Sequence, residues 1–124
     1  MNKTSLTIGM ATFDDYHGVY FSIQALRMYH PEIMDETEIL IIDNNPSGPH
    51  GKACASLAKH SPNIKYIPEE HWVSTAVRNK IFEHAEGDFV VSMDCHIFFE
   101  PGTLKKLLDY YKANPETNDL YQGP

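Results

Sequence analysis

The chain has 124 residues, of which 42% are hydrophobic and 22% are charged, and its formal net charge is −7. A chain of this length and composition can bury a core, so we interpret it as one folded domain and not as a disordered tail. No Lys/Arg cluster is present to meet a phosphate backbone, which argues against a nucleic acid as partner.

The two cysteines and the N-terminal sequence bear on the compartment. Cys54 and Cys95 lie far apart and form no CxxC motif, which is typical of reduced thiols in a reducing compartment. The first ten residues, MNKTSLTIGM, contain no long apolar region, and no run approaches the length of a membrane span. We therefore expect a soluble, cytoplasmic chain without a membrane span.

Strands and helices are predicted to alternate along the chain. The apolar patterns predict strands over residues 5–12, 38–43, 64–67 and 88–93. Helical spacing and capping residues predict helices from residue 19 to about 30, over 52–60, from the cap Ser74 to about 86, and over 103–111. Two strands are apolar almost throughout, as in a parallel sheet covered on both faces. The expected fold is a three-layer α/β/α, Rossmann-like, mostly parallel sheet.

Polar residues follow three of the predicted strands, where ligands gather in such sheets. They form the segments Thr12–Asp15, Asp43–Asn45 and Asp94–His96. No glycine fingerprint follows the first strand, and no G-x-x-x-x-G-K-[ST] loop occurs, so a diphosphate would not be held by a glycine loop. Asp14 and Asp15 would repel a phosphate unless a cation intervenes, and a divalent metal suits that role.

Asp94 and His96 are the candidate metal ligands. They stand two residues apart just past a strand, so both side chains can turn toward one ion while Cys95 points elsewhere. An oxygen and an imidazole nitrogen favour Mn²⁺ over Mg²⁺, and two ligands are too few for a closed structural zinc site. The alternative is a turn that binds no metal.

Other segments also have simpler interpretations. Asp43–Asn45 can merely end a strand and begin a turn, because Asp and Asn bond their own backbone. Arg78 can be a solvated charge on a helix. His71 beside Trp72 can be a ligand, a sugar-stacking platform or a packed aromatic loop.

Three segments together resemble a known family. LTIGMATFDD, EILIIDNN and STAVRNKIFEHAEGDFVVSMDCHIFFEPGTL resemble, in order and spacing, the nucleotide-sugar half of A-type-fold glycosyltransferases, and most nearly family two. The resemblance implies that residues 1–124 form a single nucleotide-sugar-binding glycosyltransferase domain. The family's metal motif is usually Asp-x-Asp, whereas Asp94-Cys95-His96 has the Asp-x-His form of the polypeptide N-acetylgalactosaminyltransferases, which use manganese and a uridine diphosphate (UDP) sugar.

The resemblance also implies roles for individual residues around a nucleotide sugar. Thr12 and Phe13 would line the uridine pocket, Asp43 would hydrogen-bond the base, Arg78 with Asn79 would face the nucleotide, and Asp94 and His96 would hold Mn²⁺ (or Mg²⁺) and the diphosphate. The implied partners are a UDP-sugar donor and an acceptor of unidentified class, either a saccharide, a lipid or a protein. Assembly into a homo-oligomer is left open.

The catalytic base is unknown. In the family this carboxylate lies beyond the metal motif, in the half that builds the acceptor site. Residues 120–124 resemble the beginning of another strand, so we expect either a fold incomplete at its C-terminus or a partner that completes the acceptor site. Two alternatives remain open. One is an inactive nucleotide-sugar-binding module. The other is a nucleotidyltransferase-like enzyme, although such enzymes usually carry a basic Gly-rich loop near the N-terminus, and none is visible here.

Overall fold

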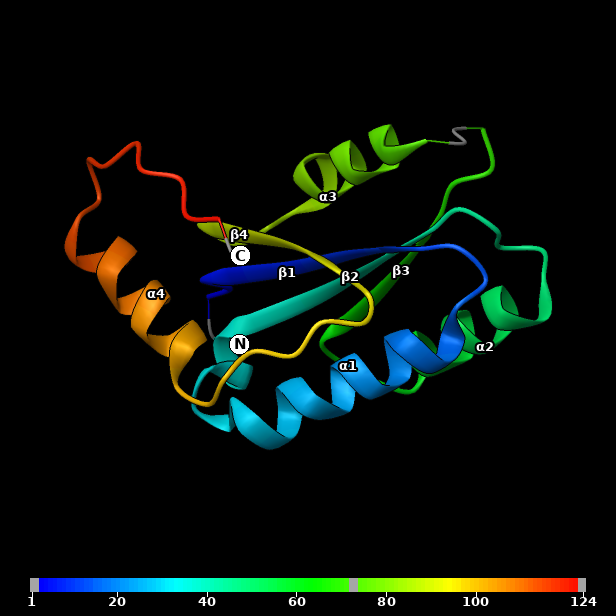
Figure 1. The fold of residues 1–124 in the computed structure, drawn as a ribbon, viewed down its shortest axis with the longest axis horizontal. Helices are drawn as coiled ribbons and strands as arrows, with labels where there is room; N and C mark the ends of the chain where they lie inside the picture. Colours follow the sequence, from blue (N-terminus) through cyan, green and yellow to red (C-terminus); the bar gives the residue numbers. More distant parts are fainter. Residues whose placement is uncertain (1–2, 72–73, 123–124) are drawn as a thin grey trace.

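The computed structural model describes residues 3–71 and 74–122, so that Trp72 lies outside the described residues (Figure 1). Within these ranges, four strands form one sheet in the order β3-β2-β1-β4, and every pairing is parallel. The strands are β1 (Leu6–Thr12), β2 (Thr37–Asp43), β3 (Ile64–Pro68) and β4 (Phe89–Asp94). The predicted parallel sheet is therefore confirmed.

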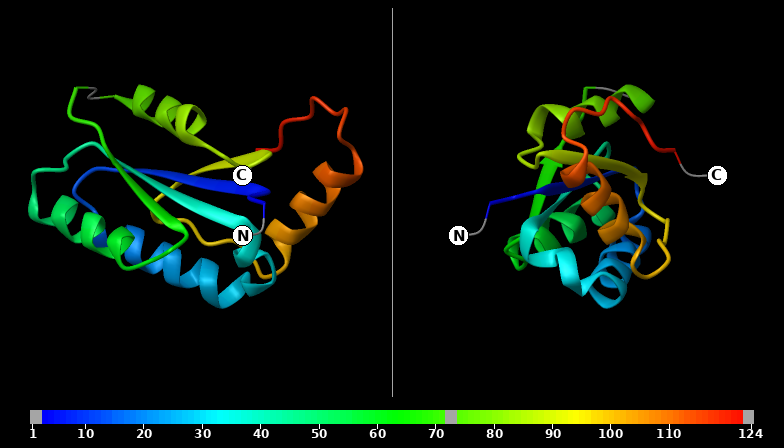
Figure 2. Two further views of the ribbon diagram at one scale, coloured as in Figure 1. Left: turned by 180° about the vertical axis from the view of Figure 1, so that it is seen from behind. Right: turned by 90° about the vertical axis from the view of Figure 1, so that its left-hand side faces the viewer.

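Helices cover both faces of this sheet. One face carries α1 (Tyr16–Tyr29), α2 (Pro49–Lys59) and α4 (Thr103–Ala113), and the opposite face carries η2 (Thr75–Arg78) and α3 (Asn79–His84) (Figures 1 and 2). A 3₁₀ helix, η1 (Pro31–Glu36), connects α1 to β2. This arrangement confirms the predicted α/β/α layers.

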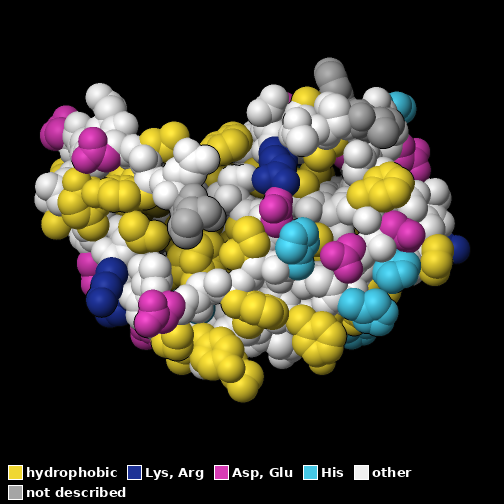
Figure 3. Space-filling view, in the orientation of Figure 1, with side chains coloured by type: hydrophobic (Ala, Val, Ile, Leu, Met, Phe, Trp, Pro, Cys, Tyr) yellow, Lys and Arg dark blue, Asp and Glu magenta, His cyan; other side chains and the backbone are white. Residues whose placement is uncertain are grey.

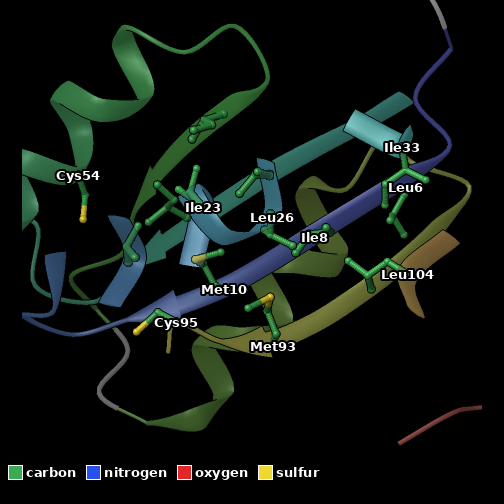
Figure 4. Close-up of a cluster of buried hydrophobic side chains, with 14 of the residues drawn as sticks. Leu6, Ile8, Met10, Ile23, Leu26, Ile33, Cys54, Met93, Cys95 and Leu104 are labelled. Atoms are coloured by element: carbon green, nitrogen blue, oxygen red, sulfur yellow. The ribbon is translucent and has the colours of Figure 1, made fainter. Parts of the chain in front are cut away.

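The two central strands send alternate side chains into the two layers, because successive residues of a strand point to opposite faces. Ile8 and Met10 of β1 join the larger hydrophobic cluster with Ile23 of α1 (Figure 4). Leu40 and Ile42 of β2 join the smaller cluster under α3. Burial on both faces explains why these strands are apolar almost throughout.

Gly9 allows α3 to lie directly against β1. A Cβ atom at this position would lie 2.3 Å from Cγ2 of Ile81, whose side chain is fully buried. Only a residue without a side chain permits such an approach. The contact fixes the layer that carries Arg78 relative to the centre of the sheet.

Two helices begin earlier than the sequence pattern predicts. α1 begins at Tyr16 and not at residue 19, because the Asp15 side chain accepts a hydrogen bond from the Gly18 N–H at 3.0 Å and caps the helix. α2 begins at Pro49 and not at residue 52, since proline is well suited to the first helical position. Both differences move a helix start toward the carboxyl edge of the sheet.

The segment after Ser74 differs from the single helix predicted there. The Ser74 hydroxyl accepts from the Ala76 N–H at 3.1 Å, as predicted for a cap, but the first turn is the 3₁₀ helix η2. The α-helix that follows ends at His84, because Ala85 takes an extended conformation. Residues 120–122 form no strand, so the interpretation of these residues as a strand start is wrong.

The helices in residues 3–71 and 74–122 are all too short or too polar to cross a membrane.

A buried carboxylate links strands at the amino edge of the sheet. Glu38 is 5% exposed and accepts hydrogen bonds from Thr7 Oγ1 at 2.6 Å and from the Glu86 N–H at 2.7 Å. Lys65 Nζ lies 2.9 Å from its second oxygen. Burial by itself would raise the pKa of Glu38, but the bonds from Thr7, Glu86 and Lys65 outweigh it and lower the pKa below its usual value.

We expect Glu38→Gln to destabilise the protein and to flatten the acid dependence of its stability. Because the folded-state pKa of Glu38 is lowered, its stabilisation is present above the unfolded pKa of about 4.3 and is lost as the pH falls through the folded value. The free energy of unfolding at neutral pH should fall by about 1–3 kcal/mol. Urea denaturation from about pH 3 to about pH 7 measures both effects.

Glu83→Gln is the matched control, since Glu83 is an exposed residue of α3. It should change the free energy of unfolding by less than about 0.5 kcal/mol. If Glu38→Gln followed the wild-type curve at every pH, the stabilising role of this carboxylate would be refuted.

Candidate functional site

The register of the sheet brings the predicted polar segments to one edge. Thr12 of β1 pairs with Asp43 of β2, and Ala11 of β1 pairs with Asp94 of β4. Because all three strands are parallel, their carboxyl ends lie in one row. A backbone hydrogen bond also connects the ends of β1 and β2, since the Asn44 N–H donates to the Thr12 carbonyl at 2.9 Å.

Asp43 lies inside this edge with its carboxylate already bonded. The residue is 1% exposed, Oδ1 accepts from the Asn45 N–H at 2.9 Å, and Oδ2 accepts from the Tyr66 hydroxyl at 2.7 Å. Burial, followed by the bond to Asp43, raises the pKa of Tyr66. The Asn45 contact is the strand-ending turn that the sequence offered as an alternative. Contact of Asp43 with a base stays a prediction. Nothing in the sequence pattern pointed to Tyr66.

Thr12 and Phe13, which are predicted to line the uridine pocket, differ in their exposure to solvent. Thr12 is buried, whereas Phe13 is 62% exposed in the loop between β1 and α1. Next to them, Asp14 has a φ of 56°, in the left-handed region that Asp tolerates better than most residues. The loop therefore presents an apolar ring at the edge of the sheet.

A hollow of about 460 Å³ opens next to Pro68, the residue of β3 that pairs with Asp43. It lies between the loop after β2 and the chain after β3, and it is lined by Pro46, Ser47 and residues 68–71. His71 belongs to this lining, so the structure places it near the predicted nucleotide edge.

Arg78 and Asp94 form an ion pair across two elements. Arg78 Nη2 at the end of η2 bonds to Asp94 Oδ1 at the end of β4. Their side chains are 41% and 39% exposed, so the pair contributes only about 0–1 kcal/mol to stability. Arg78 is thus positioned at the site and is not an isolated surface charge. Asn79 begins α3 and is exposed.

His96 lies with Asp15 and Cys95. The ligand atoms of these three residues are within 4.8 Å of one another. The Cys95 sulfur is buried and lies near Asp15 and His96. That Cys95 points away from an ion shared by Asp94 and His96 stays a prediction. Asp94 does not belong to this group of three, and its carboxylate bonds to Arg78. The shared metal role of Asp94 and His96 stays a prediction.

The groups around Asp15 favour its charged form. The hydrogen bond from the Gly18 N–H lowers the pKa of Asp15, and contacts with Cys95, His96 and His50 lower it further, against the opposing effect of burial. His50 accepts from the Tyr16 N–H at 2.9 Å. The sequence pattern did not mark His50 as a candidate site residue, because only the packing of α1 on α2 brings it close to Asp15. Acidic and histidine side chains gather on this face (Figure 3).

The donor chemistry of this edge fits a divalent cation. Asp94 offers a carboxylate and His96 an exposed imidazole, both from the end of β4. Carboxylate oxygen suits Mn²⁺ and Mg²⁺, and imidazole nitrogen moves the preference from Mg²⁺ toward transition ions.

Residues 7–122 match the sequence profile of glycosyl transferase family 2. The chain belongs to this family. An uncharacterized protein of Haemophilus influenzae is 25% identical over 124 residues, which cover 96% of this chain and 65% of that protein.

Two solved structures share the fold. S. aureus TarS 1–349 in complex with UDP-GlcNAc matches with a TM-score of 0.73 at 16% identity, over 96% of this chain and 37% of that chain. The mannosyltransferase PcManGT from Pyrobaculum calidifontis, in complex with GDP-Man and Mn²⁺, matches with a TM-score of 0.68 at 16% identity, over 90% of this chain and 32% of that one. At these identities the likeness shows the A-type fold alone. This chain spans less than two thirds of each of these proteins.

We expect Tyr66→Phe to destabilise the protein without changing its fold. The substitution removes the bond that satisfies the buried Oδ2 of Asp43 and should lower the free energy of unfolding by about 1–3 kcal/mol in urea denaturation. Tyr29→Phe, at an exposed position on α1, is the control and should have little effect. Equal losses in both variants would contradict the role of Tyr66.

Proposed function

We propose that this chain is the donor-binding part of a glycosyltransferase that uses a UDP-sugar and a divalent metal ion. One observation carries the proposal. In a domain of glycosyl transferase family 2, the parallel register aligns Thr12, Asp43 and Asp94 at the edge of the sheet where ligands bind.

The nucleoside would occupy the side of the edge formed by β1, β2 and β3. Asp43 is an acceptor for the N–H of uracil, and Tyr66 holds its carboxylate in place. The exposed ring of Phe13 offers a stacking surface for the base. The hollow lined by Pro46, Ser47 and residues 68–71 offers room for the nucleoside. The TarS structure holds UDP-GlcNAc and the PcManGT structure holds GDP-Man, so the choice of uridine rests on the sequence resemblance.

The diphosphate would lie toward β4, where Arg78 supplies a positive charge. A chain with a formal net charge of −7 repels a diphosphate unless cations are placed locally. Arg78 is held at this position by its pair with Asp94 and can also bond phosphate oxygens. Asp94 and His96 would hold Mn²⁺, which when bound stabilises the negative charge of a leaving diphosphate. Asn79, exposed beside Arg78, is a further donor to the nucleotide.

Transfer also needs a base that deprotonates the acceptor hydroxyl. We assign this role to no residue of the chain. The acceptor site and its base would come from a further segment or a partner, and the acceptor is a saccharide, a lipid or a protein.

We expect UDP to stabilise the protein only when Mn²⁺ is present. A ligand at about 100 times its Kd should add about 2.7 kcal/mol to the free energy of unfolding, which raises the Tm by several degrees. Asp94→Asn and His96→Gln should abolish the rise, because each removes a metal ligand but little stability. The measurement is a thermal-shift series with UDP, GDP and ADP, each with and without Mn²⁺.

Asp88→Asn is the matched control, since Asp88 precedes β4 at the opposite edge of the sheet and pairs with Lys3. It should leave the UDP effect unchanged. A larger shift with GDP would overturn the uridine assignment, and an equal shift without Mn²⁺ would overturn the metal assignment. Slow Mn²⁺-dependent release of UDP from a UDP-sugar would favour an enzyme, whereas binding without release would favour a donor-binding module.

A further inference from the structure

We propose that Asp15, Cys95 and His96 form a second type of metal site on this chain, one that selects Zn²⁺ over Mn²⁺ and competes for His96. The ligand atoms of these residues lie within 4.8 Å of one another, and they come from the N-cap of α1 and from the chain just after β4. The site shares His96 with the pair Asp94 and His96 discussed above, but takes Asp15 and Cys95 in place of Asp94.

The separations are close to those of a tetrahedral zinc site. Cys95 Sγ lies 3.4 Å from Asp15 Oδ2. With Zn–S and Zn–O bonds of about 2.3 Å and 2.1 Å, a tetrahedral angle places sulfur and oxygen about 3.6 Å apart. His96 is exposed, so a rotation of its side chain can close the remaining gap to both atoms. Three protein ligands leave the fourth position for water.

Two of the three ligands are held in place by the fold. The Gly18 N–H donates to Asp15 Oδ1 at 3.0 Å, which leaves Oδ2 directed at the Cys95 thiol. The Ser22 hydroxyl donates to the Cys95 carbonyl at 2.7 Å and fixes the backbone of that residue against α1. At Gly18 a Cβ atom would lie 2.3 Å from Asp15 Oδ2 and 2.8 Å from the Cys95 carbonyl oxygen. The first turn of α1 is therefore packed tightly against Asp15 and Cys95.

The ligand set selects the ion by its chemistry. A thiolate favours zinc over manganese, and imidazole suits zinc equally well, whereas Mn²⁺ prefers oxygen. Cys95 is 5% exposed and lies at the end of the hydrophobic cluster, so its sulfur meets little competing water (Figure 4). Binding converts the thiol to a thiolate: the S–H bond breaks, the sulfur–metal bond forms, and the proton passes to the buffer.

The consequence for donor binding rests on the proposed function. His96 cannot serve Zn²⁺ with Cys95 and Mn²⁺ with Asp94 at the same time. Zn²⁺ would therefore act as an inhibitor of Mn²⁺-dependent UDP binding, through a shared imidazole. The zinc site itself does not depend on that function.

Titration with Co²⁺, a spectroscopic substitute for Zn²⁺, tests the site directly. The full chain, reduced and free of metal, should develop a thiolate-to-cobalt absorption band in the near ultraviolet that saturates at about one equivalent and disappears when Zn²⁺ is added. Cys95→Ser should abolish the band, although serine can keep the hydrogen bond to Asp15. Asp15→Asn, which keeps a good helix cap, and His96→Gln should each weaken binding at least about tenfold.

Cys54→Ser is the matched control, because Cys54 is the other buried thiol and lies on α2, apart from Cys95 (Figure 4). It should leave the cobalt band intact. Absence of the band in the wild-type chain, or its loss in Cys54→Ser with retention in Cys95→Ser, would overturn the proposal.

A second readout separates this proposal from the proposed function. Cys95→Ser should still bind UDP with Mn²⁺, and Zn²⁺ should inhibit that binding at least about tenfold less than in the wild type. A wild-type chain that shows the cobalt band but does not bind UDP would contradict the proposed function and leave the zinc site supported. A chain that binds UDP with Mn²⁺ but shows no cobalt band would do the reverse.

Discussion

The hydrogen-bonded pairing of β1 with β2 on one side and β4 on the other determines the geometry of the whole domain. Burial on both faces requires β1 to be apolar, and the approach of Ile81 requires Gly9 to lack a side chain. Because a one-residue shift of register would exchange the two faces of a strand, the core fixes the register. That register aligns Thr12 with Asp43 and Ala11 with Asp94. Packing in the core thus decides which polar groups meet at the edge.

The same edge concentrates negative charge, and this shapes the chemistry it can support. Asp14, Asp15, Asp43 and Asp94 all follow or end strands there, while Arg78 brings a positive charge from the opposite layer. An anionic ligand is compatible with such an edge only together with cations. The pair of Arg78 with Asp94 adds little stability, since both side chains are partly exposed. Its role is better understood as keeping a guanidinium near the site.

His96 lies between two sets of possible partners. Asp94 is engaged by Arg78, whereas Asp15 and Cys95 have ligand atoms within 4.8 Å of the His96 ligand atom. Asp94 offers carboxylate oxygen, which is a hard metal ligand. The set with Asp15 and Cys95 also contains a sulfur atom that is shielded from water. Under the two proposals, this single exposed imidazole would serve one of two ions of different character at a time. The Asp-Cys-His order at the end of β4 makes this choice possible, because the cysteine packs onto α1 while the histidine stays exposed.

Much of the fold could be predicted from the sequence, because it follows from local patterns. Apolar runs such as residues 38–43 indicated buried parallel strands, and the polar residues after them indicated the edge where polar side chains gather. Three-dimensional packing alone decided the rest. Tyr66 bonds Asp43 across neighbouring strands, and Cys95 turns toward Asp15 from 80 residues away. Sequence patterns report periodicity over a few residues, whereas these contacts depend on register and on how α1 packs against the sheet.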